Sequence, residues 1–256
     1  FSPEYIYLFF SGVSSFLFTL VFTISGIYYI EVIEMTAFQL VFVGTVLELV
    51  YFTFEIPTGI VADVYSRKLS IILGVLLTGI GFILEGFFPL YIFVLVSQIL
   101  WGIGATFLSG ATEAWIADFL EKDRLELIYI RASQIGNISA LIGVFTSVFM
   151  ALKFIQLPII LSGILFCILG FLLFVFMPKS NFTPIVSNNL NSWRKMTITF
   201  SHSLSFIKKS NILILVLLAT FITGLASEGL DRLWIAHFIK NFSFPNFLNI
   251  SLVMWI

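Results

Sequence analysis

The chain has 256 residues, of which 59% are hydrophobic and only 11% are charged, and its formal net charge is -1. This composition excludes an ordinary soluble globular domain and predicts an all-α integral membrane protein. No basic excess points to a nucleic-acid partner, and a single cysteine, Cys167, excludes a disulfide framework or a thiolate metal cluster.

Long apolar segments follow one another along the chain. A membrane-spanning helix needs about 20 mostly apolar residues, and seven segments meet that length: 5–30, 38–62, 70–88, 90–117, 134–152, 156–177 and 211–236. An eighth begins near Phe247, and the sequence stops inside it at Ile256. Because the sequence also begins with Phe1 and not with Met, we expect it to be part of a longer protein.

Basic residues gather in the connections on one side of the predicted helices. That side holds ten of the thirteen, namely Arg67, Lys68, Lys122, Arg124, Arg131, Lys179, Arg194, Lys195, Lys208 and Lys209. The other side holds only Lys153 and Lys240, and Arg232 lies inside the seventh segment. By the positive-inside rule we expect a multi-pass protein of the cell membrane with its N-terminus in the cytoplasm.

The longest connection divides the chain into three predicted parts. These are a six-helix bundle at 1–177, a cytoplasmic central loop at 178–210, and the start of an incomplete second bundle at 211–256. Within the loop, apolar residues recur at helical spacing, at Trp193, Met196, Phe200, Leu204 and Ile207. This stripe predicts an amphipathic helix on the membrane surface, with a disordered linker as the alternative.

A short charged turn lies between the second and third apolar segments, where residues 59–68 read G-I-V-A-D-V-Y-S-R-K. The turn resembles the loop G-x-L-A-D-R-x-G-R-K of major facilitator superfamily transporters, with matches at Gly59, Ala62, Asp63, Arg67 and Lys68. The strings F-E-I-P-T-G-I-V-A-D, G-A-T-E-A-W-I-A-D and E-G-L-D-R-L resemble the bacterial drug-efflux members. The resemblance implies the major facilitator fold, whose spans form two six-helix halves, so the chain would hold the first half and the start of the second.

In that family the loop acts as a latch that favours one conformation, which implies a role for its matched residues. Asp63 would stabilise the N-terminal end of a helix in the other half through its dipole, and Arg67 would pair with Asp118 at the base of the fourth span. Gly59 would let two helices approach closely, and Lys68 completes the motif. The alternative is a basic turn that only sets the topology.

Polar side chains inside apolar segments are functional candidates, because an ionisable group there costs about 2.5 to 3.5 kcal/mol on insertion scales. The candidates are Glu48, Glu55, Gln98, Glu113, Glu228, Asp231 and Arg232. Glu48 and Glu55 share a helix face, and Glu55 and Glu113 lie at similar depth. If the last two carboxylates face each other, one would hold a proton, as in a proton carrier; structural hydrogen bonding is the alternative.

The last three candidates lie together in the seventh segment, in the string S-E-G-L-D-R-L. Glu228 and Arg232 are at i and i+4, and Asp231 is next to Arg232, so an internal ion pair can lower the cost of burial. Such a pair would either hold the structure or contact a substrate.

Two positions depart from the proton-coupled drug exporters that the chain resembles. Gln98 stands where their R-x-x-x-G-x-G motif has Arg, and Val144 follows the Gly136 and Gly143 spacing where their antiporter motif has Pro. Proton coupling would therefore depend on the glutamates named above. No phosphate loop or metal-binding spacing occurs, so we expect no cofactor, no metal and no ATP-driven step.

Together these features predict a transporter and not an enzyme, working by alternating access about a site near the bilayer midplane. We expect a monomeric multidrug efflux antiporter in the lipid bilayer that exports a small amphipathic or cationic compound against protons, with Phe22 and Trp101 in the cavity wall. One alternative is a transporter, import included, of a sugar, peptide, siderophore or lipid precursor. Another is a receptor, scaffold or membrane enzyme that does not transport.

Overall fold

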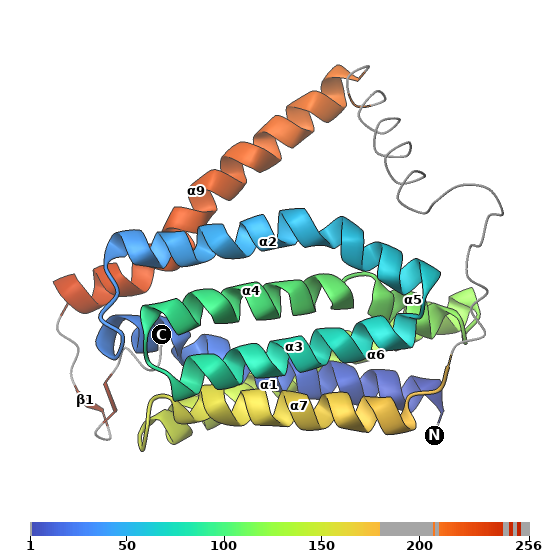
Figure 1. Cartoon of the computed structure of the whole chain (residues 1–256), viewed down its shortest axis with the longest axis horizontal. Helices are drawn as coiled ribbons and strands as arrows, with labels where there is room; N and C mark the ends of the chain where they lie inside the picture. The colour runs from blue at the N-terminus through green and yellow to red at the C-terminus, as the bar shows by residue number, and fades with distance from the viewer. Residues whose placement is uncertain (1, 180–206, 208–209, 243–245, 248–249, 252–256) are drawn as a thin grey trace.

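Long helices lying side by side make up most of the computed structural model (Figure 1), which describes residues 2–179, 207, 210–242, 246–247 and 250–251. They are α1 (Pro3–Glu31), α2 (Ala37–Val64), α3 (Arg67–Phe87), α4 (Tyr91–Leu108), α5 (Ala111–Ala117), α6 (Lys122–Ala151), α7 (Leu157–Phe176) and α9 (Asn211–Asn241). With α4 and α5 taken as one span, seven helices of the described residues are long and apolar enough to cross a membrane. The seven predicted spans are thereby confirmed.

The fifth span begins earlier than predicted. The apolar segment starts at residue 134, whereas α6 begins at Lys122 and has Asp123 in its first turn. Charged residues in the first turns lower the local hydropathy without breaking a helix, and an acid near the N-terminus favours the helix dipole. The basic residues Lys122, Arg124 and Arg131 therefore lie on a helix and not in a loop.

Two other predicted elements fall largely outside the described residues. The amphipathic stripe from Trp193 to Leu204 is one of them. The second is the eighth span, at whose expected start Asn246–Phe247 and Ile250–Ser251 form two short antiparallel strands, β1 and β2. These four residues depart from the all-α prediction.

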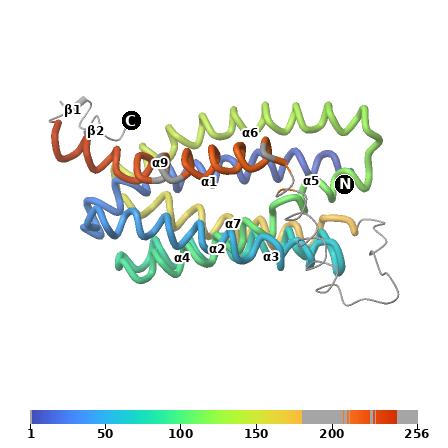
Figure 2. The backbone as a smooth tube through the Cα atoms, turned by 90° about the horizontal axis from the view of Figure 1, so that it is seen from above, coloured from blue at the N-terminus to red at the C-terminus, as the bar shows by residue number. Residues whose placement is uncertain are grey.

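The bundle is built around α1 and α3. The first packs against α6 and α7, the second packs between α4 and α7, and α2 packs against α4. Figure 2 shows α6 beside α1, with α2, α3 and α4 on the other side of the bundle. Figure 1 shows α9 inclined to the bundle, with one end near the first part of α2 and the other end pointing away; α9 contacts α2 and α1. The fully buried side chains at the centre include Leu17, Leu20, Tyr28, Phe82 and Phe166.

Small residues bring the α3 and α4 backbones together. A Cβ atom added at Gly74 would lie 2.6 Å from the carbonyl oxygen of Gly104, so neither position accepts a side chain without movement. Serine hydroxyls join other helices: Ser147 of α6 and Ser162 of α7 donate to the α1 carbonyls of Leu20 and Leu17, at 2.7 and 2.8 Å. Close packing and interhelical hydrogen bonds of this kind hold helices together where lipid removes most of the hydrophobic drive.

The fourth span is interrupted between α4 and α5, although its apolar pattern predicts one helix over 90–117. Gly110 has a φ of 68°, in the left-handed region that glycine reaches without steric cost. Its neighbour Ser109 also leaves the helical region, with ψ at 123°. The break re-aims the chain and places Glu113 on the separate short helix α5.

Candidate functional site

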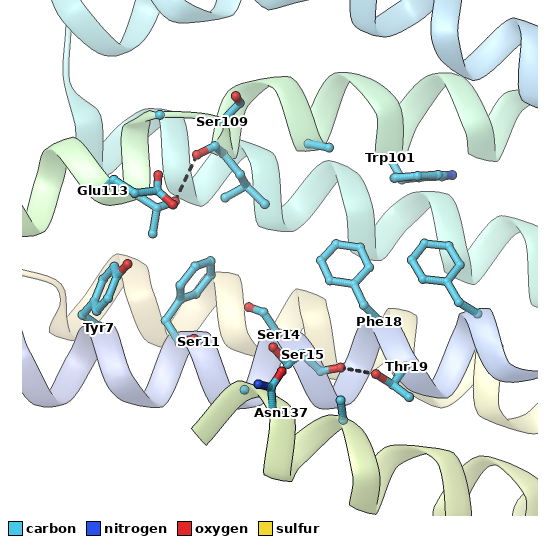
Figure 3. Close-up of a pocket in the computed structure, with 18 of the residues that line it drawn as sticks. Tyr7, Ser11, Ser14, Ser15, Phe18, Thr19, Trp101, Ser109, Glu113 and Asn137 are labelled. Atoms are coloured by element: carbon cyan, nitrogen blue, oxygen red, sulfur yellow. Dashed lines mark hydrogen bonds between the residues drawn. The ribbon is translucent and has the colours of Figure 1, made fainter. Parts of the chain in front are cut away.

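A cavity of about 990 Å³ lies between α1, α2, α4, α5 and α6. One face of α1 forms a long wall, since its lining residues recur every three or four positions. Figure 3 shows that wall opposite Trp101 and Glu113, with Asn137 of α6 beside it. The lining residues are Tyr7, Phe10, Ser11, Ser14, Ser15, Phe18, Thr19, Phe22, Tyr51, Trp101, Ala105, Leu108, Ser109, Gly110, Thr112, Glu113, Gly136, Asn137 and Ala140.

Aromatic rings line one part of the cavity. The rings of Phe22 and Trp101 lie 5.6 Å apart between centroids at an angle of 60°, and Tyr51 meets Trp101 edge-on at 6.3 Å. Phe22 is 49% exposed, so this aromatic surface is open to an incoming molecule. The prediction that Phe22 and Trp101 lie in the cavity wall is confirmed.

Two polar groups on the wall have unused hydrogen-bonding capacity. The Ser14 hydroxyl and the Trp101 Nε1 group are buried, and neither has a hydrogen-bond partner among the described residues. Other hydroxyls of the wall are occupied, since Thr19 donates to the Ser15 carbonyl at 2.8 Å and Ser11 to the Ala132 carbonyl at 3.1 Å. A buried donor without a partner costs about 1–3 kcal/mol, so a bound molecule that supplies an acceptor recovers that energy.

Glu113 is the one acid among the described residues that line the cavity. The break at Gly110 places its exposed side chain at the cavity end that also holds Tyr7 (Figure 3). The carboxyl group is in electrostatic range of the Tyr7 and Tyr129 hydroxyls, and Tyr129 also donates to the Glu113 backbone carbonyl at 3.2 Å. The site thus combines one negative charge with aromatic walls.

Glu55 reaches the cavity edge through another residue. The Ser109 hydroxyl, on the cavity wall, donates to Glu55 Oε1 at 2.7 Å. Glu48 and Glu55 both interact electrostatically with Tyr51 between them, which confirms their shared helix face. Among the described residues, Glu55 is hydrogen-bonded to Ser109 and not to the carboxyl group of Glu113. A pair of facing carboxylates is therefore not observed.

The predicted ion pair of the loop motif is present. Arg67 Nη1 contacts Asp118 Oδ1 and donates to the Ala114 carbonyl at 2.8 Å, joining the start of α3 to the end of α5. Lys68 has a role that the motif did not predict, because its ammonium group donates to the carbonyls of Phe174 and Met177 at 2.8 and 2.6 Å. It thereby caps the C-terminal end of α7.

Two other motif residues, Asp63 and Gly59, have no close side-chain partner among the described residues. Asp63 is exposed, and no hydrogen bond or ion pair of the described residues includes its side chain. A Cβ atom added at Gly59 would meet no heavy atom within 4 Å. The described residues include only the start of the predicted second half, so the roles implied for Asp63 and Gly59 stay predictions.

Residues of the seventh span stay partly untested. Asp231 is exposed, and Arg232 is half-buried and in electrostatic range of the Tyr29 hydroxyl of α1. The Glu228 side chain lies outside the described residues, so its pairing with Arg232 stays a prediction.

Gln98 lies away from the cavity, in a polar cluster that also contains a residue missed by the sequence reasoning. Its side chain is 3% exposed, and Nε2 donates to the Tyr29 hydroxyl at 3.4 Å. That hydroxyl in turn donates to Glu85 Oε1 at 2.7 Å. Glu85 was not among the candidate polar residues, yet it is helical and 1% exposed. Its place inside the apolar segment 70–88 was the available signal.

Comparison with known proteins identifies the wider group. The model of the Major Facilitator Superfamily matches residues 7–256. The MFS-type transporter YxaM of Bacillus subtilis (strain 168) is 24% identical over 196 residues, which are 77% of this chain and 49% of that protein. The chain thus spans about half the length of this relative.

Two solved structures have the same fold. The nucleoside transporter NupG superposes with a TM-score of 0.77 at 13% identity, over 99% of this chain and 63% of that one. A POT family transporter crystallised with a thioalcohol-conjugated peptide gives a TM-score of 0.58 at 18% identity, over 86% and 47%. At these identities the likeness concerns the fold alone.

Proposed function

The chain belongs to the major facilitator superfamily, and from this premise we propose that it forms the first six-helix half of a monomeric secondary active transporter, together with the start of the second half. The transporter works by alternating access, in which the two halves rock about a central site. The excess of basic residues on one side supports a cell-membrane protein with a cytoplasmic N-terminus. The family consists of transporters, which argues against an enzyme.

The substrate we propose is a small amphipathic or cationic compound. The observation that carries this proposal is the cavity of about 990 Å³, whose wall joins aromatic rings at Phe22, Tyr51 and Trp101 to a single carboxyl group at Glu113. Aromatic faces attract a cation through the ring quadrupole, and the carboxyl group adds a charge of opposite sign. The Ser14 hydroxyl and the Trp101 Nε1 group are donors of the wall without a partner among the described residues.

Coupling to protons and export are the finer parts of the proposal. Glu113 faces the cavity, so a proton and a cationic substrate would compete for one carboxylate, and this competition exchanges one for the other. Glu55 can act with it through Ser109. Export follows from the resemblance to drug-efflux members, while Gln98 and Val144 remain departures from their pattern.

A polar solute, such as a nucleoside, sugar or peptide, is the second candidate substrate. Ser11, Ser14, Ser15 and Thr19 form a hydroxyl-rich strip on α1, and Asn137 of α6 lies beside it. Such a strip suits a substrate with several hydrogen-bonding groups. NupG and the POT family transporter are named for nucleosides and for a bound peptide, but their likeness to this chain supports only the fold.

The test is uptake of a lipophilic cation into inside-out vesicles that contain the full-length protein, with and without an imposed proton gradient. We expect gradient-dependent accumulation, loss of most of it in Glu113→Gln, and little change in Glu126→Gln. Glu126 is the matched control, because it is an exposed acid on α6 that does not line the cavity. No accumulation of the cation by a folded protein would refute the cation-exporter proposal. Inhibition of the cation uptake by a nucleoside or a peptide, and not by other cations, would favour the second candidate.

A further inference from the structure

A second polar site lies inside the bundle where α1, α3 and α4 meet, and none of its residues lines the cavity. Glu85 of α3 is at its centre, 1% exposed, with Ser97 and Gln98 of α4 at 0% and 3%. From Arg67 to Glu85 is about 27 Å along the α3 axis at a rise of about 1.5 Å per residue. The site therefore lies at the end of the bundle opposite the ion pair of Arg67.

The hydrogen bonds around Glu85 satisfy only part of it. The Tyr29 hydroxyl donates to Oε1 at 2.7 Å, and the Tyr28 hydroxyl donates to the Glu85 backbone carbonyl at 2.7 Å. Three buried oxygen atoms of this cluster have no hydrogen-bond partner among the described residues: Glu85 Oε2, Ser97 Oγ and Gln98 Oε1. The Ser97 hydroxyl is in interaction range of the Glu85 carboxyl group but makes no hydrogen bond to it, so one carboxyl oxygen stays without a bonded donor.

No described neighbour compensates a negative charge on Glu85. The titratable groups that face it are the two α1 tyrosines, α4 adds only the uncharged Ser97 and Gln98, and α7 packs there through Ile160. Arg232 of α9 lies in electrostatic range of Tyr29, and neither ion pair of the described residues includes Glu85. A buried carboxylate in such surroundings is costly, and it is relieved when the group becomes neutral.

We propose that Glu85 binds a proton and that this cluster is a proton-binding site separate from the substrate cavity. A proton on Oε2 removes the buried charge and turns an acceptor without a partner into a donor within range of Ser97 Oγ of α4. The neutral acid then joins α1 to α4 through α3. This inference goes beyond the transport proposal, because Glu85 lies outside the cavity and failure of cation uptake would leave it intact.

One layer of aromatic rings separates the two sites. Phe82 precedes Glu85 by about one helical turn, and its ring lies 6.2 Å from that of Trp101 and 6.2 Å from that of Phe22, both in the cavity wall. With the carboxyl group 1% exposed, water in the cavity does not reach it. The proton is therefore held behind this layer.

Infrared difference spectroscopy of the purified full-length protein, with carbon-13 label in glutamate, tests the proposal. We expect the carbonyl band of a protonated carboxylic acid in the wild type at neutral pH, and its loss in Glu85→Gln. The amide of Gln keeps a carbonyl acceptor for Tyr29 and a donor in place of the acid proton, so the fold is retained. In Glu55→Gln, where the acid is exposed and bound to Ser109, the band stays.

The wild type alone keeps the test decisive even if Glu85→Gln fails to fold. Tyr29→Phe removes the hydroxyl that donates to Oε1, so the band should shift in frequency in that variant. A wild type without a protonated carboxyl band at neutral pH, or the same unshifted band in Glu85→Gln, would overturn the proposal. A sodium ion is the other group that these oxygen atoms could bind. A missing band, together with a saturable rise in thermal stability when sodium chloride replaces choline chloride, would overturn the proton proposal and indicate a sodium site.

Discussion

The ion pair between Arg67 and Asp118 should stabilise the fold measurably, because it is shielded from solvent. The two side chains are 16% and 18% exposed, and Arg67 also donates to the Ala114 carbonyl. Hydrogen bonds to charged groups contribute about 1.5–3 kcal/mol and exposed ion pairs about 0–1 kcal/mol. Between these limits we expect a coupling energy of about 1–2 kcal/mol, or roughly 5- to 30-fold in the unfolding equilibrium.

A double-mutant cycle measures this coupling directly. Arg67→Ala, Asp118→Ala and the double variant of the full-length protein are unfolded in mixed micelles, and the interaction energy is the non-additive part of the free energy of unfolding. The pair of Arg124 and Glu4 is the matched control, at 3.7 Å with side chains 75% and 32% exposed. Its cycle should give less than about 0.5 kcal/mol and vanish at high salt. Equal coupling in the two cycles would refute the argument from shielding.

Four further substitutions test other contacts. Gly104→Ala should destabilise the protein by about 1–3 kcal/mol in the same unfolding assay, since its Cβ would lie 2.6 Å from the Gly74 carbonyl oxygen. Gly59→Ala is the control: its Cβ would meet nothing within 4 Å, so the free energy of unfolding should change by less than about 0.5 kcal/mol. Equal effects of the two substitutions would contradict the packing. Lys68→Met should lower the free energy of unfolding by about 1–2 kcal/mol, because two hydrogen bonds to the end of α7 are lost. An unchanged free energy of unfolding would contradict this role of Lys68. Gly110→Ala should cost about 1–2 kcal/mol because an alanine at a φ of 68° is strained, and an unchanged midpoint would mean that α4 and α5 are continuous.

The spans and the ion pair were predictable because each depends on a local pattern. About 20 apolar residues in a row cross a bilayer whatever their neighbours are, and the turn at residues 59–68 carries its pairing residue, Arg67, at a recognisable spacing. The partner Asp118 follows because it ends the fourth apolar segment on the same side.

The break in the fourth span and the burial of Glu85 were not predictable in the same way. A single glycine in an apolar segment such as Gly110 is usually a packing residue, and only its backbone dihedral shows that the helix stops there. Glu85 stands near the end of its apolar segment, where a charge normally marks the water interface. Its burial depends on Tyr28 and Tyr29, more than fifty residues away in the sequence.

The two sites place acidic groups in opposite surroundings within one half of the fold. Glu113 is exposed on a short helix at the open cavity, where a carboxyl group can exchange a proton or meet a cation. Glu85 is enclosed by three helices and has its tyrosine donor on only one oxygen. Replacement by glutamine should therefore separate their roles, since Glu113→Gln would remove most of the cation uptake and keep the carboxylic acid band, whereas Glu85→Gln would abolish the band. If both variants lost both properties together, the aromatic layer of Phe82 and Trp101 would be transmitting changes between the sites and not separating them.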